Sequence, residues 1–333
     1  MAELFSQIGP TGQGLIFLIS QPRSGSTLLQ RMLASHLDIY SVSEPWVALH
    51  PIYALKEKGF RAEYNECLAR RAVQGFYNTL PEGEDDYIEG IRRLLTHLYS
   101  RALEGHEKGY FLDKTPRYYY IIPELYRLFP DAKFVFLFRN PLAVLGSIIS
   151  TWVKSDILSL YRFRDDLLLA PSYMMDGVEL LGDKGKVVHY ESLISRPDEE
   201  LKKLCEYLDL SPDSEMVNYG KKEMPQWEFG DPENVYKKRS PDLSVADKWL
   251  NQIDSPQIKR LFSDYLERLG SDRLASMGYS SIDLMADIQS KSKHSLVTWV
   301  YSLEFLLKRH DDRSLGGRLL MRFVRTIETI RQR

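Results

Sequence analysis

Cysteine, long apolar runs and an excess of charge of either sign are all scarce in this sequence. Two of its 333 residues are cysteines, Cys67 and Cys205, which are too few for a disulfide framework and give no spacing typical of a metal site. No basic segment precedes a long apolar run, as in a signal peptide, and no apolar stretch reaches the roughly 20 residues that cross a bilayer. We therefore expect a soluble, cytoplasmic protein.

Charge and length narrow the class further. A net charge of −2 argues against a general nucleic-acid-binding protein, and the length suffices for one large domain with an ample core. Residues 291–333 differ, because they hold ten Lys and Arg against four Asp and Glu, with apolar residues at helical spacing. We predict a main domain over residues 1–283 and a basic, amphipathic helical extension over residues 284–333.

Residues 15–33 predict a strand, a tight loop and a helix that together form an anion site. Residues 15–19 are a short apolar run, as in a buried parallel strand, and Pro22 ends it. Gly25 allows a ligand to approach the backbone closely. Ser26 and Thr27 begin a helix whose free N–H groups attract an anion.

This loop lacks the lysine of a nucleoside-triphosphate loop, G-x-x-x-x-G-K-(Ser/Thr), because Ser26 stands at that position. The positive charge lies instead at Arg23, before the glycine. The strand predicted over residues 133–138 ends in Arg139, where many nucleotide triphosphatases carry a metal-binding Asp. We therefore expect the loop to hold a phosphate-like group without the machinery for Mg²⁺-triphosphate chemistry.

Apolar runs alternate with helical patterns along the main domain. Strands are predicted over residues 110–112, 133–138 and 186–190, and helices over residues 84–104, 122–129 and 191–208 and from Pro141, with Asn140 as its cap; residues 38–46 form an irregular segment. The alternation predicts an α/β fold of three layers, with helices on both faces of a central, mostly parallel sheet. Ligands bind outside the carboxyl ends of such strands. The side chains that follow predicted strands should converge there: Arg23, Lys114, Arg139 and Tyr190.

These pieces resemble the sulfotransferases that use 3′-phosphoadenosine 5′-phosphosulfate. Residues 22–27 are similar to the family's 5′-phosphosulfate loop, P-[RK]-S-G-[ST]-T, and residues 139–147 to its 3′-phosphate segment, R-x-P followed by V-x-x-S. Residues 190–193 are similar to its Y-E-x-L, whose Tyr lies near the adenine, and residues 236–249 to the basic stretch that closes over the 3′-phosphate. The resemblance implies these donor-binding residues: Arg23, Ser24, Gly25, Ser26, Thr27, Arg139, Ser147, Tyr190, Lys237, Lys238, Arg239 and Lys248.

The resemblance also implies a reaction, which is in-line transfer of a sulfuryl group from this donor to a hydroxyl or amine acceptor. The product is adenosine 3′,5′-bisphosphate. Arg23, Lys114 and the N–H groups of the loop would offset the negative charge that develops on the leaving phosphate. The single negative charge of a sulfuryl group removes the need for a metal.

The general base distinguishes two branches of the family. Many cytosolic members carry Lys-Thr-His after the second strand, and the His is their base, but residues 114–116 read Lys-Thr-Pro here. Protein-tyrosine sulfotransferases and related bacterial enzymes place a Glu after the first helix, and Glu44 matches that position. We therefore expect a protein closer to this second branch, with Glu44 as the base and His50 as the alternative.

Several questions stay open at the level of sequence. The aromatic segments 46–80 and 154–175 should line the acceptor pocket, and they suit a small molecule, a carbohydrate, a lipid or a peptide equally. The basic extension packs on the main domain or a partner copy, or it attaches to an anionic membrane surface. Two other functions compete, namely a small-molecule or nucleotide kinase on the same loop and a non-catalytic binding protein.

Overall fold

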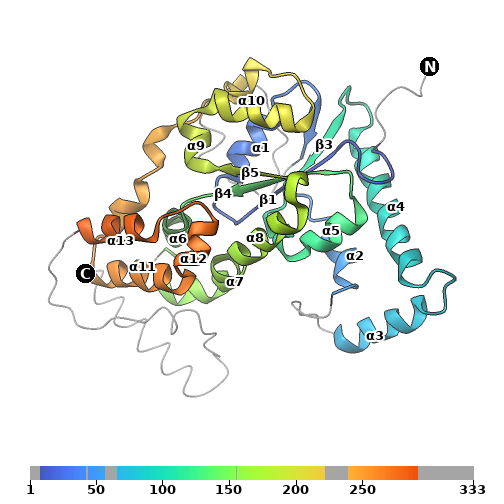
Figure 1. The fold of residues 1–333 in the computed structure, drawn as a ribbon, viewed down its shortest axis with the longest axis horizontal. Coiled ribbons are helices and arrows are strands. Elements are labelled where there is room, and N and C mark those ends of the chain that lie inside the picture. Colours follow the sequence, from blue (N-terminus) through green and yellow to red (C-terminus); the bar gives the residue numbers. More distant parts are fainter. Residues whose placement is uncertain (1–7, 43, 57–65, 155, 222–238, 292–333) are drawn as a thin grey trace. The chain divides into compact units, whose positions relative to one another are not determined.

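The computed structural model describes residues 8–42, 44–56, 66–154, 156–221 and 239–291 (Figure 1). The chain divides into two compact units. The first consists of Met1–Arg139 and Ala170–Leu243, and the second of Asn140–Leu169 and Ser244–Arg333.

A parallel sheet forms the centre of the first unit. Its strands run in the order β2-β3-β1-β4-β5, and every pair of neighbours is parallel. Their bounds are Leu15–Ser20 for β1, Ile39–Ser41 for β2, Tyr110–Asp113 for β3, Lys133–Phe138 for β4 and Gly185–His189 for β5. Because all the strands are parallel, their carboxyl ends and the loops that follow them lie at one edge of the sheet.

Helices cover both faces of this sheet. The helices of this unit are α1 (Ser26–Ala34), α2 (Leu49–Tyr53), α3 (Glu66–Tyr77), α4 (Glu84–Leu103), α5 (Ile122–Leu128), α8 (Ala170–Leu181), α9 (Tyr190–Ser195) and α10 (Pro197–Leu208), with short helical turns η1 (Pro116–Ile121), η4 (Gly182–Lys184), η5 (Ser214–Met216) and η6 (Tyr219–Lys221). Figure 1 shows α1, α9 and α10 above the strands and α5 and α8 below them. The expected three-layer α/β fold is thus confirmed.

Local sequence explains several of these elements. In α4, buried side chains recur at helical spacing, including Ile88, Ile91 and Leu95, and the helix ends just before Gly105, which has a φ of 83°. Such a left-handed glycine is a common end to a helix. The predicted helix over residues 84–104 is therefore confirmed, as are the strands predicted over residues 15–19, 110–112 and 133–138.

The second unit is helical in its described part. It holds α6 (Pro141–Ile148), η2 (Ile149–Val153), η3 (Ile157–Phe163), α7 (Arg164–Leu168), η8 (Lys248–Gln252), α11 (Pro256–Leu269), α12 (Ser271–Ser276) and α13 (Ser281–Ser290), while η7 (Leu243–Val245) lies where the units meet in sequence. The Asn140 side chain accepts a hydrogen bond from the N–H of Leu142 (2.9 Å) and caps α6 as predicted. The core of this unit includes Leu145, Trp249 and Phe262.

Two local predictions were wrong. Residues 38–46 are not wholly irregular, because Ile39–Ser41 forms the edge strand β2. A three-residue strand is too short to show an alternating pattern, so its pairing with β3 is what identifies it. Residues 186–208 do not form one strand and one helix as expected. Tyr190 begins α9, the helix is interrupted at Arg196, and Pro197 begins α10.

The predicted C-terminal extension stays a prediction. Helix α13 runs across the expected boundary at residue 283, and residues 292–333 lie outside the described part of the chain. Among the described residues, no single helix has the length and apolar composition of a membrane span, although one bent pair, Pro141–Val153 with Ile157–Lys184, meets both criteria when taken together.

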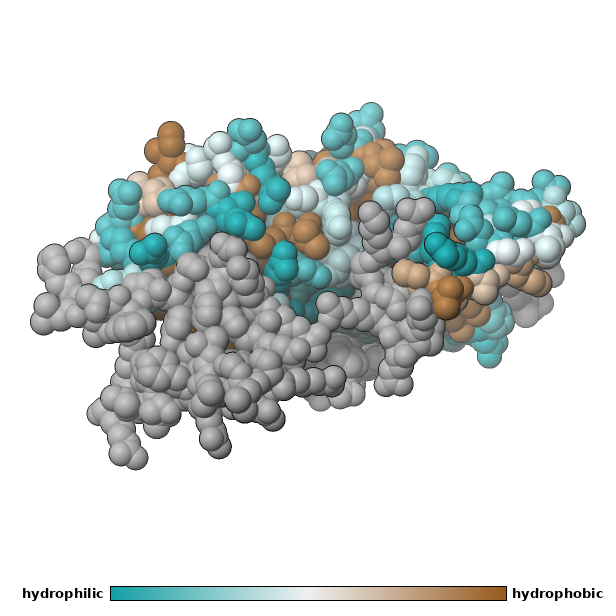
Figure 2. Space-filling model, turned by 90° about the horizontal axis from the view of Figure 1, so that it is seen from below, coloured by the Kyte–Doolittle hydropathy of each residue, from teal (hydrophilic) through white to brown (hydrophobic). Residues whose placement is uncertain are grey.

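Apolar side chains are exposed at several separate places. Examples are Phe76 on α3 in the first unit and Trp152 and Ile282 in the second. On the face that Figure 2 presents, the apolar residues of the described part form separate patches among hydrophilic ones. Scattered exposed apolar residues are usual on protein surfaces, so these patches do not themselves indicate an acceptor class.

Candidate active site

The loop after β1 is shaped by its backbone. The N–H and the hydroxyl of Ser24 both donate to the carbonyl of Gln21, at 3.3 and 2.8 Å. Arg23 and Gly25 have φ values of 68° and 94°, in the left-handed region that most residues avoid. These turns lead directly into α1, whose first turn contains no acidic residue. The arrangement presents a helix N-terminus to an anion.

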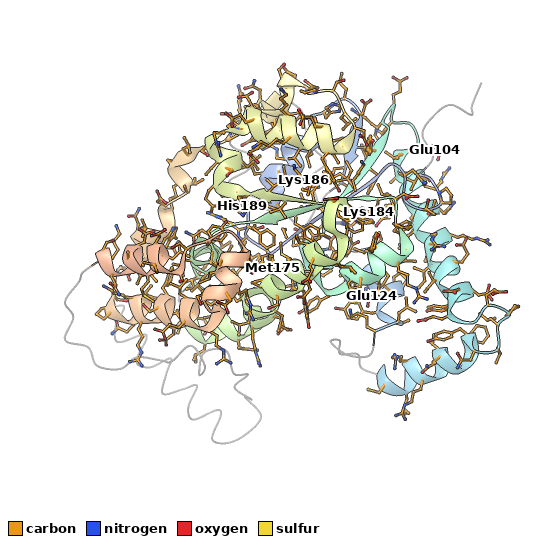
Figure 3. The ribbon with its side chains drawn as sticks, viewed as in Figure 1. Glu104, Glu124, Met175, Lys184, Lys186 and His189 are labelled. Carbon is orange, nitrogen blue, oxygen red and sulfur yellow. The ribbon has the colours of Figure 1, made fainter. Side chains whose placement is uncertain are left out.

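Gly25 is required by its surroundings as well as by its φ. A Cβ atom at this position would lie 2.4 Å from two ring carbons of Tyr190, far closer than atoms can approach. Tyr190 begins α9 and is buried, and Figure 3 labels His189 just before it at the end of β5. The glycine therefore lets the aromatic ring lie directly against the anion loop.

Arg139, which follows β4, joins this cluster. Its Nη1 donates to the carbonyl of Arg23 (3.0 Å), and its guanidinium lies 4.4 Å from the centre of the Tyr190 ring. Within the described residues, its Nε is buried and makes no hydrogen bond. Stacking and one backbone bond hold the guanidinium in place, which leaves a donor nitrogen beside the loop.

Glu44 and Lys114 form an ion pair on the other side of the loop's strand. Lys114 follows β3, the neighbour of β1, and its Nζ lies 2.8 Å from Glu44 Oε1. The lysine side chain is 0% exposed and the glutamate side chain 15%. A buried ammonium requires such a partner, because an unpaired charge is costly to bury. The glutamate segment is tied to α1, since Gln30 Nε2 donates to Ser41 Oγ (2.8 Å) and to the carbonyl of Val42 (2.6 Å).

A buried carboxylate, Asp113, precedes this lysine, and the sequence did not single it out. It accepts hydrogen bonds from the hydroxyls of Tyr99 (2.7 Å), Tyr118 (2.9 Å) and Thr115 (2.9 Å). Burial raises the pKa of Asp113 to about 6, although these bonds and Lys114 act in the opposite direction. The sequence gives little indication of this contact, because Tyr99 lies on α4, well before Asp113 in the chain.

The other predicted site residues are distributed over several parts of the sequence. Ser26 and Thr27 open α1, and His50 is exposed in α2. Arg239 is exposed, and its carbonyl accepts from the N–H of Gly220 (3.2 Å). Two predicted residues belong to the second unit, Ser147 in α6 and Lys248 in η8. Lys237 and Lys238 lie outside the described residues.

No metal site accompanies these groups in the described part of the chain, where no cluster of three or more His, Cys, Asp or Glu could hold an ion. The described site therefore consists of two parts at one edge of the sheet. One part is a backbone-built anion loop with a stacked guanidinium, and the other is a buried ammonium with its carboxylate. Together they offer cations for an anionic donor and a carboxylate that could accept a proton.

Comparisons with known proteins identify a family. A model described as "Sulfotransferase family" matches residues 16–214. The nodulation protein NoeE of Sinorhizobium fredii is 28% identical, covering 80% of this chain and 66% of its own length. A putative protein-tyrosine sulfotransferase of Caenorhabditis briggsae is 22% identical, covering 79% of this chain and 90% of its own length.

Among solved structures, the sulfotransferase domain from the curacin biosynthetic pathway superimposes with a TM-score of 0.56 at 22% identity, covering 80% of this chain and 98% of that domain. A likeness at this identity concerns the fold alone. It shows that the five-stranded sheet and its helices are arranged as in that domain.

Proposed function

Because this chain belongs to the sulfotransferase family, we propose that it moves a sulfuryl group from 3′-phosphoadenosine 5′-phosphosulfate to a hydroxyl or amine acceptor. The observation that carries this proposal is the buried pair of Lys114 and Glu44 (2.8 Å) beside the strand that leads into the anion loop. A fixed ammonium and a carboxylate at the same edge as an anion site are the groups that sulfuryl transfer needs.

The anion loop and α1 would hold the 5′-phosphosulfate. Gly25 lets the loop pass against the Tyr190 ring without a clash, and the helix N-terminus favours negative charge. Arg139 would bind the 3′-phosphate through its buried Nε, which has no partner among the described residues. Tyr190 supports that guanidinium with its ring. Ser147, Lys237, Lys238, Arg239 and Lys248 remain predicted contributors to the 3′-phosphate site.

Glu44 would act as the general base. The acceptor oxygen or nitrogen attacks sulfur, its proton passes to the Glu44 carboxylate, and the bond between sulfur and the 5′-phosphate oxygen breaks. Lys114, Arg23 and the loop N–H groups then face the charge left on that phosphate. The contact between Glu44 and Lys114 supports this assignment, because it would keep the base close to a cation for the leaving group.

Relatives named protein-tyrosine sulfotransferases make a peptide tyrosine one acceptor to test, beside carbohydrates, lipids and small phenols. The chain spans only 66% of the length of NoeE and 57% of the Drosophila melanogaster enzyme, so the activity of those whole proteins is not transferred to it. A cytoplasmic location remains a prediction.

Two measurements test this function. Adenosine 3′,5′-bisphosphate should raise the melting temperature of the protein, and Mg²⁺-ATP should not. A ³⁵S-labelled donor should then transfer its label to at least one member of a panel of peptide, carbohydrate, lipid and phenol acceptors. Stabilisation by Mg²⁺-ATP alone would favour a kinase, and donor binding without transfer to any acceptor would favour a non-catalytic protein.

A further inference from the structure

We propose that Asp113 is a positioning residue that acts through the hydroxyls of Thr115 and Tyr118. These hydroxyls fix the backbone of residues 46–48, and this in turn holds Glu44 against Lys114. The role of Glu44 rests on the function proposed above, whereas the fixing of the backbone is a property of the fold and can be measured separately.

A continuous set of hydrogen bonds joins the Asp113 carboxylate to the loop that carries Glu44, residues 44–48. Thr115 Oγ1 donates to Asp113 Oδ1 (2.9 Å) and accepts from the N–H of Trp46 (3.3 Å). Tyr118 Oη donates to Asp113 Oδ2 (2.9 Å) and accepts from the N–H of Ala48 (3.2 Å). Asp113, Thr115 and Tyr118 are all essentially inaccessible to solvent, so water does not easily replace these bonds.

The direction of each bond follows from the charge on Asp113. An ionised carboxylate can only accept, so both hydroxyls must give it their single hydrogen. Each hydroxyl then has only lone pairs to offer on its other side. Those lone pairs meet backbone N–H groups of the loop, which can only donate. Asp113 therefore sets the polarity that the loop requires.

The loop needs this support because its backbone is strained. Trp46 has a φ of 57°, in the left-handed region that costs a bulky residue free energy and persists only where surrounding contacts enforce it. The two anchored N–H groups are on Trp46 itself and on Ala48, at the start of the turn into α2. Glu44 lies two residues before this strained position, so a change in the backbone of residues 46–48 would displace the Glu44 carboxylate.

The charge on Asp113 depends on the groups that surround it. Tyr99 on α4 donates to Oδ2, Tyr118 on η1 and Thr115 donate as described, and the Lys114 ammonium adds a favourable charge. Burial outweighs them and raises the pKa of Asp113 to about 6. Above this pH the Asp113 carboxylate can only accept hydrogen bonds. Below this pH the added proton occupies one acceptor position, so one hydroxyl can no longer donate to it.

The test compares variants that break the network on different sides. Tyr118→Phe and Thr115→Val each remove a hydroxyl that touches both Asp113 and the loop, and Thr115→Ser keeps one. Asp113→Asn keeps the shape but turns one acceptor into a donor. Tyr99→Phe is the matched control, because the Tyr99 hydroxyl contacts Asp113 Oδ2 (2.7 Å) and the Tyr118 hydroxyl but, within the described residues, makes no hydrogen bond to the backbone of residues 46–48.

Hydrogen–deuterium exchange of the amides of residues 46 and 48, read at pH 8 by mass spectrometry, gives the result without reference to activity. We expect exchange to rise by about tenfold in Tyr118→Phe, Thr115→Val and Asp113→Asn, as for loss of one buried hydrogen bond. Thr115→Ser and Tyr99→Phe should exchange like the parent. Equal exchange in all variants, or an equal rise in Tyr99→Phe, would overturn the proposal.

Transfer rates separate this proposal from the function it rests on. In the variants with faster exchange, the rate of ³⁵S transfer should fall about tenfold. The affinity for adenosine 3′,5′-bisphosphate should be retained, because these substitutions leave the anion loop after β1 unchanged. If exchange changes as expected but Glu44→Gln transfers at the parental rate, the positioning stands and the assignment of Glu44 as base fails.

Discussion

The loops after β1 and β3 follow two paired parallel strands, yet they are built in opposite ways. The β1 loop is formed by backbone, with left-handed Arg23 and Gly25 leading into a helix. The β3 loop is formed by buried side chains, since Asp113 and Lys114 are 0% exposed and are held by hydroxyls and by Glu44. One loop presents N–H groups to an anion, and the other presents a fixed ammonium and its carboxylate.

This difference separates binding from chemistry. A backbone loop of neighbouring residues depends mainly on its local conformation, and we propose that it binds the 5′ end of the donor. The side-chain loop depends on α4, η1 and the segment after β2, which are far apart in sequence. We therefore expect damage to the β1 loop to reduce donor affinity, and damage to the β3 loop to reduce the transfer rate.

The largest effect is expected at the buried ammonium. Lys114→Met should lower the rate of ³⁵S transfer by about 10³-fold, because it removes the cation that we propose for the leaving phosphate and takes away the Lys114 partner of Glu44. Binding of adenosine 3′,5′-bisphosphate, measured by calorimetry, should weaken far less. The control is Lys133→Met, because Lys133 begins β4, pairs with Asp209 (2.7 Å) and should not affect transfer. A similar loss of affinity and rate in Lys114→Met would remove the contrast between the loops.

Asp113 should make stability depend on pH in an unusual direction. Its pKa is raised from 3.8 to about 6 by folding, so the folded state binds the proton more tightly than the unfolded state. The contribution of Asp113 to the free energy of unfolding is therefore largest below about pH 4. It falls as the pH rises to about 6, by at most about 3 kcal/mol. Denaturant unfolding of the parent and Asp113→Asn at several pH values measures the difference between them. That difference should shrink or reverse across this window, and a constant difference would contradict the raised pKa.

Gly25→Ala should damage the β1 loop. The new Cβ would sit in a left-handed conformation and 2.4 Å from the Tyr190 ring, at a cost of about 2 kcal/mol. We expect the Kd for adenosine 3′,5′-bisphosphate to rise by at least about tenfold. The control is Gly90→Ala in α4, where nothing lies within 4 Å of the new atom, and where helix propensity predicts a gain of up to about 1 kcal/mol. Parental affinity in Gly25→Ala would show that the loop does not bind the donor.

The smallest expected effect is at Arg139. Arg139→Lys keeps the charge but loses the planar group that stacks on Tyr190 and bonds to Arg23, so donor affinity should fall about tenfold with little change in rate. Arg127→Lys, at a half-exposed surface ion pair, should leave affinity unchanged. If Arg139→Lys lowers the rate instead, the division between binding and chemistry is misplaced.

The two loops also differ in how far the sequence revealed them. The anion loop, its strand and the N-cap of α6 could be predicted because each depends on neighbouring residues, such as Gly25 and Asn140. Lys114 was predicted from its position after a strand and Glu44 from a family resemblance, as separate residues, and the structure places them in contact.

What the sequence could not reveal is set by distant contacts. Asp113 matters through Tyr99 and Tyr118, whose hydroxyls arrive from α4 and η1, and no pattern of spacing encodes that meeting. The edge strand Ile39–Ser41 is likewise defined by its partner, β3, and not by its own three residues. Local motifs are thus readable from sequence, whereas buried polar networks need the fold.

The most direct test of Glu44 as the general base is the rate of ³⁵S transfer by three proteins, namely the parent, Glu44→Gln and His50→Ala, with the best acceptor from the panel. Glu44→Gln should lower the rate by about 10³-fold and keep the parental affinity for adenosine 3′,5′-bisphosphate, because the amide keeps the shape but cannot take the proton. His50→Ala should transfer at nearly the parental rate, since His50 is exposed in α2. A parental rate in Glu44→Gln together with a large loss in His50→Ala would contradict this assignment.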